Sequence, residues 1–246
     1  MGRKNYKIKI MKLYYKCFHK FLSPYYYNRI LKEEGIEVGD HTIFYDPFSQ
    51  TIDRERPWML TIGDYCKITK GTIILTHDYS RSVLRRAFGE VIGEAKNTVI
   101  GDNGFIGMNS IILMGTHIGN NVIIGAGSVV SGNIPDNAVI AGNPARVIRT
   151  LDEHFSIRKN KTIDEAVEYF VLFKRKYHRE PSIAEMNAFF PLYLERNREC
   201  LANSNVNIDL TGDNREEVIE GFLKTSPVFG SYDEFKKYAT LNEDKI

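Results

Sequence analysis

The sequence lacks the features of several large classes of protein. Its 246 residues contain only three cysteines, Cys17, Cys66 and Cys200, which lie far apart and form no CxxC motif. This pattern argues against a disulfide framework or a thiolate metal site and is typical of a reducing cytoplasm. No apolar run reaches the ~18 residues that a transmembrane helix needs. The first residues interleave charged and apolar side chains without a small-residue cleavage site, so we expect no secretory signal and a cytoplasmic location.

Acidic residues are absent from the beginning of the chain. Residues 1–32 contain nine Lys and Arg residues and no Asp or Glu, although the formal net charge of the whole chain is only +2. Apolar residues accompany these charges: Tyr6, Ile10, Leu13, Tyr14, Phe18 and Phe21. A basic amphipathic helix of this kind usually packs on its own domain, and the alternative is a weak contact with an anionic membrane surface. The basic residues form no aromatic-interleaved platform, so no nucleic-acid partner is expected.

A repeat of six residues dominates the middle of the chain. Branched aliphatic residues recur at this interval without a break: Ile100, Ile106, Ile112, Ile118, Ile124 and Val130. Four positions after them stand mostly small residues: Gly104, Ser110, Thr116, Val122 and Ser128. Further upstream, Ile62, Ile68 and Ile74 have the same spacing.

A period of six fits neither an α-helix nor a long strand. It fits a triangular coil with three hexads per turn, in which each aliphatic residue points inward and stacked turns bury a continuous apolar column. The period fails in residues 45–61 and 79–97, which we predict to leave the coil as loops. Arg81, Arg85 and Phe88 in the second loop suggest an ordered, partly apolar flap.

This repeat resembles that of the hexapeptide-repeat acyltransferases, over roughly residues 35–150. The resemblance implies a mainly β fold, a left-handed parallel β-helix, and a homotrimer with each acetyl-CoA groove between two coils. We expect a basic helical segment over residues 1–34, the coil over 35–150 and an α-helical extension over 151–246. In that extension, capping-box sequences each predict the beginning of a helix: Thr162-x-x-Glu165, Ser182-x-x-Glu185 and Ser231-x-x-Glu234.

His77 is the candidate catalytic residue. It ends the run Ile73-Ile74-Leu75-Thr76-His77, where the second loop departs. The sugar and polysaccharide O-acetyltransferase branch of the family, similar to the maltose and galactoside acetyltransferases, carries a histidine in a similar run. The resemblance therefore implies that His77 is the general base for an acceptor hydroxyl, which is a poor nucleophile at neutral pH.

Two aspartates are candidates for binding the acceptor. Asp46 stands where the first loop begins, and its carboxylate can accept two hydroxyl hydrogen bonds. Its position before Pro47 is equally typical of a turn. Asp78 follows the histidine directly, but neighbouring residues of a strand face opposite ways, so we do not expect Asp78 to orient the His77 ring.

The end of the repeat resembles the closing signature of the family. Gly125-Ala126-Gly127-Ser128 is followed by Gly142-Asn143-Pro144-Ala145-Arg146-Val147-Ile148-Arg149. The resemblance places pantetheine along Ala126 and places Arg146 and Arg149 near the phosphates of CoA, which suit the guanidinium group. The other candidate cofactor-binding residues are Phe105, Gly107 and Ser131. Phe105 replaces a Trp that many relatives have, and Gly132 replaces a Lys or Arg.

The function predicted from these features is acetyl-CoA-dependent O-acetylation of a carbohydrate hydroxyl, in the synthesis of a surface polysaccharide or another glycan. N-acetylation of an antibiotic or an amino sugar is the nearest alternative. A zinc hydrase of the γ carbonic-anhydrase type needs three histidine ligands, and Val122 stands five residues after His117 where such an enzyme has histidine, so no metal is expected. A non-catalytic scaffold would need neither His77 nor the arginine pair. The fold alone does not fix the acceptor.

Overall fold

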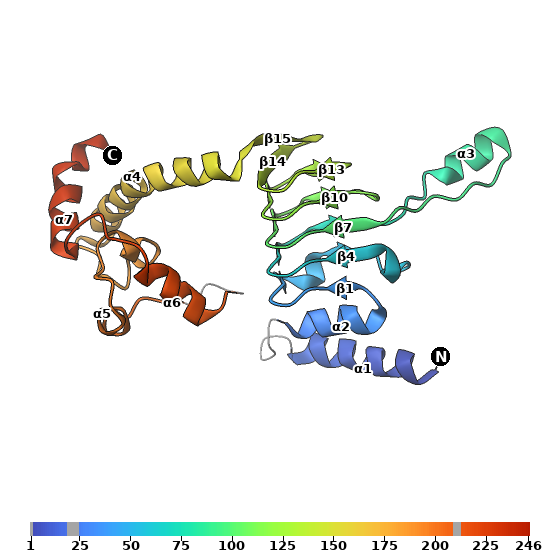
Figure 1. The fold of residues 1–246 in the computed structure, drawn as a ribbon, viewed down its shortest axis with the longest axis horizontal. Helices are drawn as coiled ribbons and strands as arrows, with labels where there is room; N and C mark the ends of the chain where they lie inside the picture. The colour runs from blue at the N-terminus through green and yellow to red at the C-terminus, as the bar shows by residue number, and fades with distance from the viewer. Residues whose placement is uncertain (1, 19–24, 209–212) are drawn as a thin grey trace. The chain divides into compact units, whose positions relative to one another are not determined.

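The computed structural model describes residues 2–18, 25–208 and 213–246, so Phe21 lies outside the described residues. The chain divides into two compact units, Met1–His154 and Phe155–Ile246. The first unit contains a three-sided coil of short strands with two helices at its N-terminal end (Figure 1). In the described part of the chain, no helix has the length and apolarity required to cross a membrane.

Three parallel sheets form the walls of the coil, and neighbouring strands within a wall come from successive turns. The first wall contains β1 (Glu37–Val38), β4 (Leu60–Ile62), β7 (Thr98–Ile100), β10 (His117–Ile118) and β13 (Asn133–Ile134). The second contains β2 (Ile43–Phe44), β5 (Lys67–Ile68), β8 (Phe105–Ile106), β11 (Ile123–Ile124), β14 (Ala138–Gly142) and β15 (Ala145–Thr150). The third contains β3 (Thr51–Ile52), β6 (Ile73–Ile74), β9 (Ile111–Ile112) and β12 (Val129–Val130). At the end of the second wall, β15 pairs antiparallel with β14.

The aliphatic residues of the repeat form the core of the coil. On the second wall, Ile68, Ile106 and Ile124 follow one another in register and are fully buried. The small residues at the corners are buried too, and their hydroxyls bond to the backbone: Ser128 Oγ donates to the Gly125 carbonyl at 2.6 Å. The inward direction predicted for both sets of residues is therefore confirmed.

Side chains of Asp and Asn form a ladder along the corner between the first and second walls. The Asp64 carboxylate accepts the N–H of Asp40 at 2.6 Å, and the Asp102 carboxylate accepts the N–H of Asp64 at 2.8 Å. Asn120 and Asp136 continue this pattern. Each side chain satisfies a backbone donor of the turn below it, at a bend where the strand ladder is interrupted.

The prediction that residues 45–61 leave the coil is wrong for part of this segment. Thr51–Ile52 forms β3, which pairs in register with β6, and Ile52 is buried in the core. The period fails here because the 3₁₀ helix η2 (Pro47–Ser49) lengthens the corner, so Ile52 follows Phe44 by eight positions instead of six. A second 3₁₀ helix, η3 (Pro57–Met59), lengthens the next corner.

Residues 79–97 do leave the coil, as an arm that carries a helix. Helix α3 (Arg81–Phe88) lies at the end of this arm, away from the strands (Figure 1). At its base, Ala95 forms an antiparallel bridge with His77, and Lys96 N–H donates to the Thr76 carbonyl at 2.9 Å. The predicted flap is thus an exposed helix whose base is fixed next to His77.

Two helices cover the first turn of the coil: α1 (Gly2–Phe18) and α2 (Tyr26–Glu34). Tyr15 of α1 is buried and stacks on Tyr26 with ring centroids 5.8 Å apart. Leu31 of α2 is fully buried and belongs to the same core as the isoleucines of the coil. The N-terminal segment therefore packs on its own domain.

The second unit is helical and has a hydrophobic core of its own, in which Phe170 and Phe235 are fully buried. It contains most of α4 (Leu151–Tyr177), then η4 (Asn187–Leu192), α5 (Arg198–Asn203), α6 (Arg215–Leu223), α7 (Tyr232–Leu241) and η5 (Glu243–Lys245).

Of the three predicted capping boxes, the one at Ser231 begins a helix, because its hydroxyl accepts the Glu234 N–H at the start of α7. Thr162 lies inside α4, which begins instead after a capping box formed by Thr150 and Glu153. Ser182 forms reciprocal bonds with Glu185, but turns and the 3₁₀ helix η4 follow instead of an α-helix. The predictions at Thr162 and Ser182 are therefore wrong.

Candidate active site

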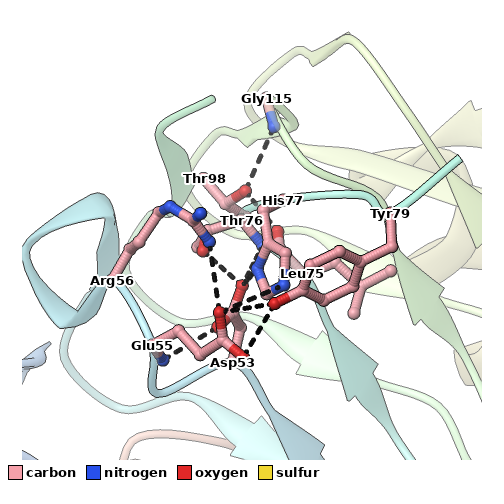
Figure 2. Close-up of polar contacts among 9 residues, drawn as sticks. All are labelled: Asp53, Glu55, Arg56, Leu75, Thr76, His77, Tyr79, Thr98 and Gly115. Atoms are coloured by element: carbon pink, nitrogen blue, oxygen red, sulfur yellow. Dashed lines mark hydrogen bonds and ion pairs between the residues drawn. The ribbon is translucent and has the colours of Figure 1, made fainter. Parts of the chain in front are cut away.

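His77 lies just beyond the end of β6, and Asp53 follows β3 in the turn below. The Asp53 N–H donates to the Ile74 carbonyl at 3.0 Å, which continues the β3–β6 ladder and places Asp53 opposite Leu75, two residues before His77. Nδ1 of the His77 ring forms a hydrogen bond with Oδ2 of Asp53 (Figure 2). Because both residues extend rigid strands, the ring is held from below by a carboxylate.

The Asp53 carboxylate is buried and accepts hydrogen bonds from several donors. Oδ2 accepts the Thr76 N–H at 3.0 Å and the Thr76 hydroxyl at 2.5 Å, and Oδ1 accepts the Glu55 N–H at 3.0 Å. Burial raises the pKa of Asp53, but the hydrogen bonds from Thr76, from the Glu55 N–H and from His77 outweigh it, so the pKa lies below its ordinary value. An ionised carboxylate accepts a hydrogen bond from Nδ1–H, and in the neutral ring this tautomer leaves a lone pair on Nε2 of His77.

The opposite edge of the His77 ring faces a second carboxylate. Nε2 lies 3.6 Å from Oε2 of Glu55. The Tyr79 hydroxyl donates to both carboxylate oxygens of Glu55, at 3.0 and 2.9 Å, and its ring packs edge-on against the histidine (Figure 2). The hydrogen bond to Glu55 raises the pKa of Tyr79, so this hydroxyl stays a donor. The ring is therefore fixed on one side by a buried carboxylate and faces an exposed carboxylate on the other.

The two aspartates predicted to bind the acceptor lie at different places. Asp78 is next to His77, and its carboxylate accepts the Ser80 N–H at 2.5 Å in the turn before α3. Asp46 lies at the corner between the second and third walls, where its carboxylate is 3.5 Å from the Lys70 ammonium. His77 lies at the next corner, between the third and first walls, so within one chain the coil does not bring Asp46 to His77. The role of both aspartates stays a prediction.

Two of the predicted cofactor residues meet at the corner that also carries Asp46. Gly107 lies directly below Ala126, and a Cβ built at Gly107 would be 2.5 Å from the Ala126 nitrogen. A larger residue at position 107 would therefore push two turns apart, which gives this glycine a packing role beside the predicted one. Ala126 itself is exposed at the corner.

The remaining predicted cofactor residues lie near the end of the coil. Phe105 of β8 is exposed, and Arg146 and Arg149 lie on β15 at the edge of the same wall. One nitrogen of Arg146 donates to the Ala145 carbonyl at 2.8 Å. Ser131 follows β12, at the corner where His77 lies two turns below. Their contact with a cofactor stays a prediction.

Sequence reasoning missed three residues of this site: Asp53, Glu55 and Tyr79. No repeat spacing could have found Asp53, because it precedes His77 by 24 positions whereas the paired residues of β3 and β6 are 22 positions apart. Among residues 2–18, 25–208 and 213–246, no group of three or more His, Cys, Asp or Glu side chains could hold a metal ion.

Comparison with known proteins gives one family. Residues 97–131 match the model described as the hexapeptide repeat of succinyl-transferase. The chain is 38% identical over 139 residues to Protein CapG of Staphylococcus aureus, a match that covers 56% of this chain and 80% of that protein.

Two further relatives come from Escherichia coli K12. A galactoside O-acetyltransferase is 36% identical over 130 residues, which cover 52% of this chain and 61% of the relative. A putative lipopolysaccharide biosynthesis O-acetyl transferase, WbbJ, is 52% identical over 56 residues, 23% of this chain and 29% of the relative. The chain thus spans less than two thirds of the length of these two relatives. Its repeat, its three-walled left-handed parallel β-helix and its match to most of CapG show that the chain belongs to the hexapeptide-repeat acetyltransferase family.

Proposed function

We propose that the protein is an O-acetyltransferase that transfers the acetyl group of acetyl-CoA to a carbohydrate hydroxyl, in the synthesis of a surface polysaccharide or another glycan. The observation that carries this proposal is the His77 ring, whose Nδ1 is bonded to the buried Asp53 and whose Nε2 faces an exposed side of the coil. Galactoside and lipopolysaccharide O-acetyltransferases among the relatives support a carbohydrate acceptor.

In the proposed reaction, His77 Nε2 takes the proton of the acceptor hydroxyl while the hydroxyl oxygen attacks the thioester carbonyl carbon. The carbon–oxygen bond forms and the carbon–sulfur bond breaks. The protonated ring then gives its proton to the departing thiolate, so the products are an acetyl ester and CoA. Asp53 holds the ring in the required tautomer and stabilises the positive charge that develops on it.

The donor is proposed to lie along Ala126, with Arg146 and Arg149 binding the CoA phosphates. Each groove lies between two coils of a homotrimer in this proposal. On the last strand of the coil Arg146 is exposed and Arg149 is half-buried, and guanidinium groups suit a phosphate-rich ligand.

Replacing His77 with Ala tests the proposal. We expect kcat for acetyl transfer to fall by at least ~10²-fold with acetyl-CoA affinity nearly unchanged, because the variant loses a general base and no donor contact. His117→Ala is a matched control, since His117 is an exposed histidine on a strand of the same coil. If the His77→Ala variant keeps wild-type turnover, the proposed mechanism is wrong.

We also propose a cytoplasmic location, which the three scattered cysteines support, and a weak contact of helix α1 with the inner face of the membrane in addition to its packing on the coil. Tyr6, Ile10 and Leu13 are exposed on α1, on the side opposite the buried Tyr15, and Lys9 and Lys16 lie beside them. Cations next to an exposed apolar stripe favour an anionic lipid surface.

Vesicle co-sedimentation checks this placement. The wild type should bind phosphatidylglycerol vesicles more strongly than phosphatidylcholine vesicles, and Lys9→Glu with Lys16→Glu should abolish the difference. Equal binding to both kinds of vesicle would contradict the contact.

A further inference from the structure

The carboxylate of Glu55 occupies the place from which an acceptor must approach His77. The two sides of the histidine differ sharply in exposure: the Asp53 side chain is 2% exposed and the Glu55 side chain 57%. The histidine itself is 10% exposed. A molecule that reaches Nε2 from solvent therefore passes along Glu55 and Tyr79, which form the open wall of the site (Figure 2).

Nε2 of a neutral His77 ring and the Glu55 carboxylate cannot form a hydrogen bond with each other, because both are acceptors. In the neutral ring that the proposed role of His77 as a base requires, Nδ1–H donates to Asp53 and Nε2 carries a lone pair, whereas an ionised carboxylate offers acceptors alone. Their separation of 3.6 Å is longer than a hydrogen bond. The site therefore presents two acceptors side by side, and a ligand with two adjacent donors complements it.

A single hydroxyl has one proton and can satisfy one of the two acceptors. Two hydroxyls on neighbouring ring carbons of a sugar satisfy both, because their oxygens are about one hydrogen-bond length apart. The first hydroxyl donates to Nε2 and is the one that reacts, whereas the second donates to Glu55 and keeps its proton.

The charges around Glu55 favour a neutral partner over an ammonium group. The Arg56 guanidinium lies 3.5 Å from Oε2, and the Tyr79 hydroxyl donates to both oxygens. The Arg81 guanidinium lies over the Tyr79 ring at 5.3 Å. The Arg56 cation offsets the negative charge of the carboxylate, so a positive group on the ligand would gain little.

We propose that Glu55, held in place by Tyr79, binds the hydroxyl adjacent to the reacting one and thereby selects vicinal diols of neutral sugars as acceptors. This inference rests on the proposed role of His77 as the general base. Glu55 is then an acceptor-binding residue, and Tyr79 is a positioning residue that acts through it.

The experiment compares pyranosides that differ by one hydroxyl. Acetyl transfer from acetyl-CoA is measured with methyl β-D-galactopyranoside and methyl β-D-glucopyranoside, with their monodeoxy analogues, and with methyl 2-amino-2-deoxy-β-D-glucopyranoside. In the wild type, removal of the hydroxyl next to the acetylated position should lower kcat/KM about ten- to a hundredfold, the range expected for a hydrogen bond to a charged group.

Variants then identify the residue responsible. In Glu55→Ala the ratio of diol to deoxy analogue should approach one, mainly through a higher KM for the diol, and Tyr79→Phe should give an intermediate ratio. Glu37→Ala is the matched control, because Glu37 is an exposed glutamate on β1 that accepts a hydrogen bond from the Thr61 hydroxyl at 3.2 Å. This control should keep the wild-type ratio.

The outcomes separate this inference from the proposed function. Transfer by the wild type with an unchanged ratio in Glu55→Ala refutes the inference alone. A Glu55-dependent preference for the amino sugar refutes the selection of neutral diols. If the wild type acetylates none of these pyranosides, or if His77→Ala stays active, the proposed function is wrong and the inference is wrong with it.

Discussion

Replacing Asp53 with Asn changes the charge under the His77 ring while leaving its shape almost unchanged. Oδ2 of Asp53 accepts three hydrogen bonds, from the Thr76 N–H, the Thr76 hydroxyl and His77 Nδ1, whereas Oδ1 accepts one, from the Glu55 N–H. An amide can place its oxygen in one of these two positions. If the amide oxygen takes the Oδ2 position, its NH₂ group faces one hydrogen-bond donor, the Glu55 N–H. If the oxygen takes the Oδ1 position, the NH₂ group faces the three donors that surround Oδ2.

The first orientation is therefore favoured, and it keeps the proton on Nδ1. The variant then loses the negative charge and retains the tautomer. A hydrogen bond to a charged group is worth about 1 kcal/mol more than a neutral one, so kcat should fall about fivefold. A serine-protease triad in which the same substitution gives the wrong tautomer loses about 10⁴-fold, and the two mechanisms are thus easy to distinguish.

The assay measures kcat and both KM values, together with the ¹⁵N chemical shifts of the His77 ring. The expected result is a lower kcat, an unchanged KM for acetyl-CoA and a ring that still carries its proton on Nδ1. Asp64→Asn serves as the control, because Asp64 caps a coil N–H in the same way without touching His77. If kcat falls 10³-fold or more, or if the proton moves to Nε2, the amide oxygen does not take the Oδ2 position and the predicted orientation is wrong. An unchanged kcat would show that Asp53 does not assist the histidine.

Three further predictions follow from the described geometry. Arg146→Ala or Arg149→Ala should weaken binding of CoA more than binding of CoA without its 3′-phosphate, measured by calorimetry, because the lost contact is charge-assisted; equal weakening would make the arginines structural. Sedimentation at micromolar concentration should give about three times the chain mass of 28.3 kDa, and an active monomer would contradict a groove shared between coils. Because the pKa of Asp53 is lowered in the fold, its ionisation stabilises the protein above about pH 4, and this contribution disappears as the pH falls through the lowered pKa. The difference in the free energy of unfolding by urea between wild type and Asp53→Asn should therefore shrink below about pH 4. A difference that grows there would mean that the pKa of Asp53 is raised in the fold.

The regular part of the coil could be predicted from the sequence because each hexad repeats the same local requirement. Ile106, Ile112 and Ile118 must each point inward, and this need recurs every six residues whatever the neighbouring turns contain. The position of β3 could not be predicted in this way. The insertion of η2 changes the interval, and Ile52 then matches no hexad although it is buried in the same core.

The catalytic histidine proposed here could be identified from the sequence, but its partner could not. His77 stands in a recognisable run, whereas Asp53 touches it only because β3 and β6 pair across a turn. The side chains of Glu55 and Tyr79 form a hydrogen bond at the beginning of the arm, where the six-residue period does not apply. The predicted helix start at Thr162 was wrong for another reason. Thr162 has the local sequence of a helix cap, but α4 begins at Leu151 and continues through this position.

The antiparallel strand at the end of the coil has a consequence for self-association. A stack of parallel strands exposes on its last turn a row of N–H and C=O groups that matches the first turn of another copy, and repeated matching of this kind builds fibres. On the second wall, β15 covers that row and presents a strand of reversed direction. At the opposite end, the buried Leu31 of α2 belongs to the core that the first turn shares. Both ends of the coil are therefore capped, and copies of the protein are prevented from stacking end to end into a fibre.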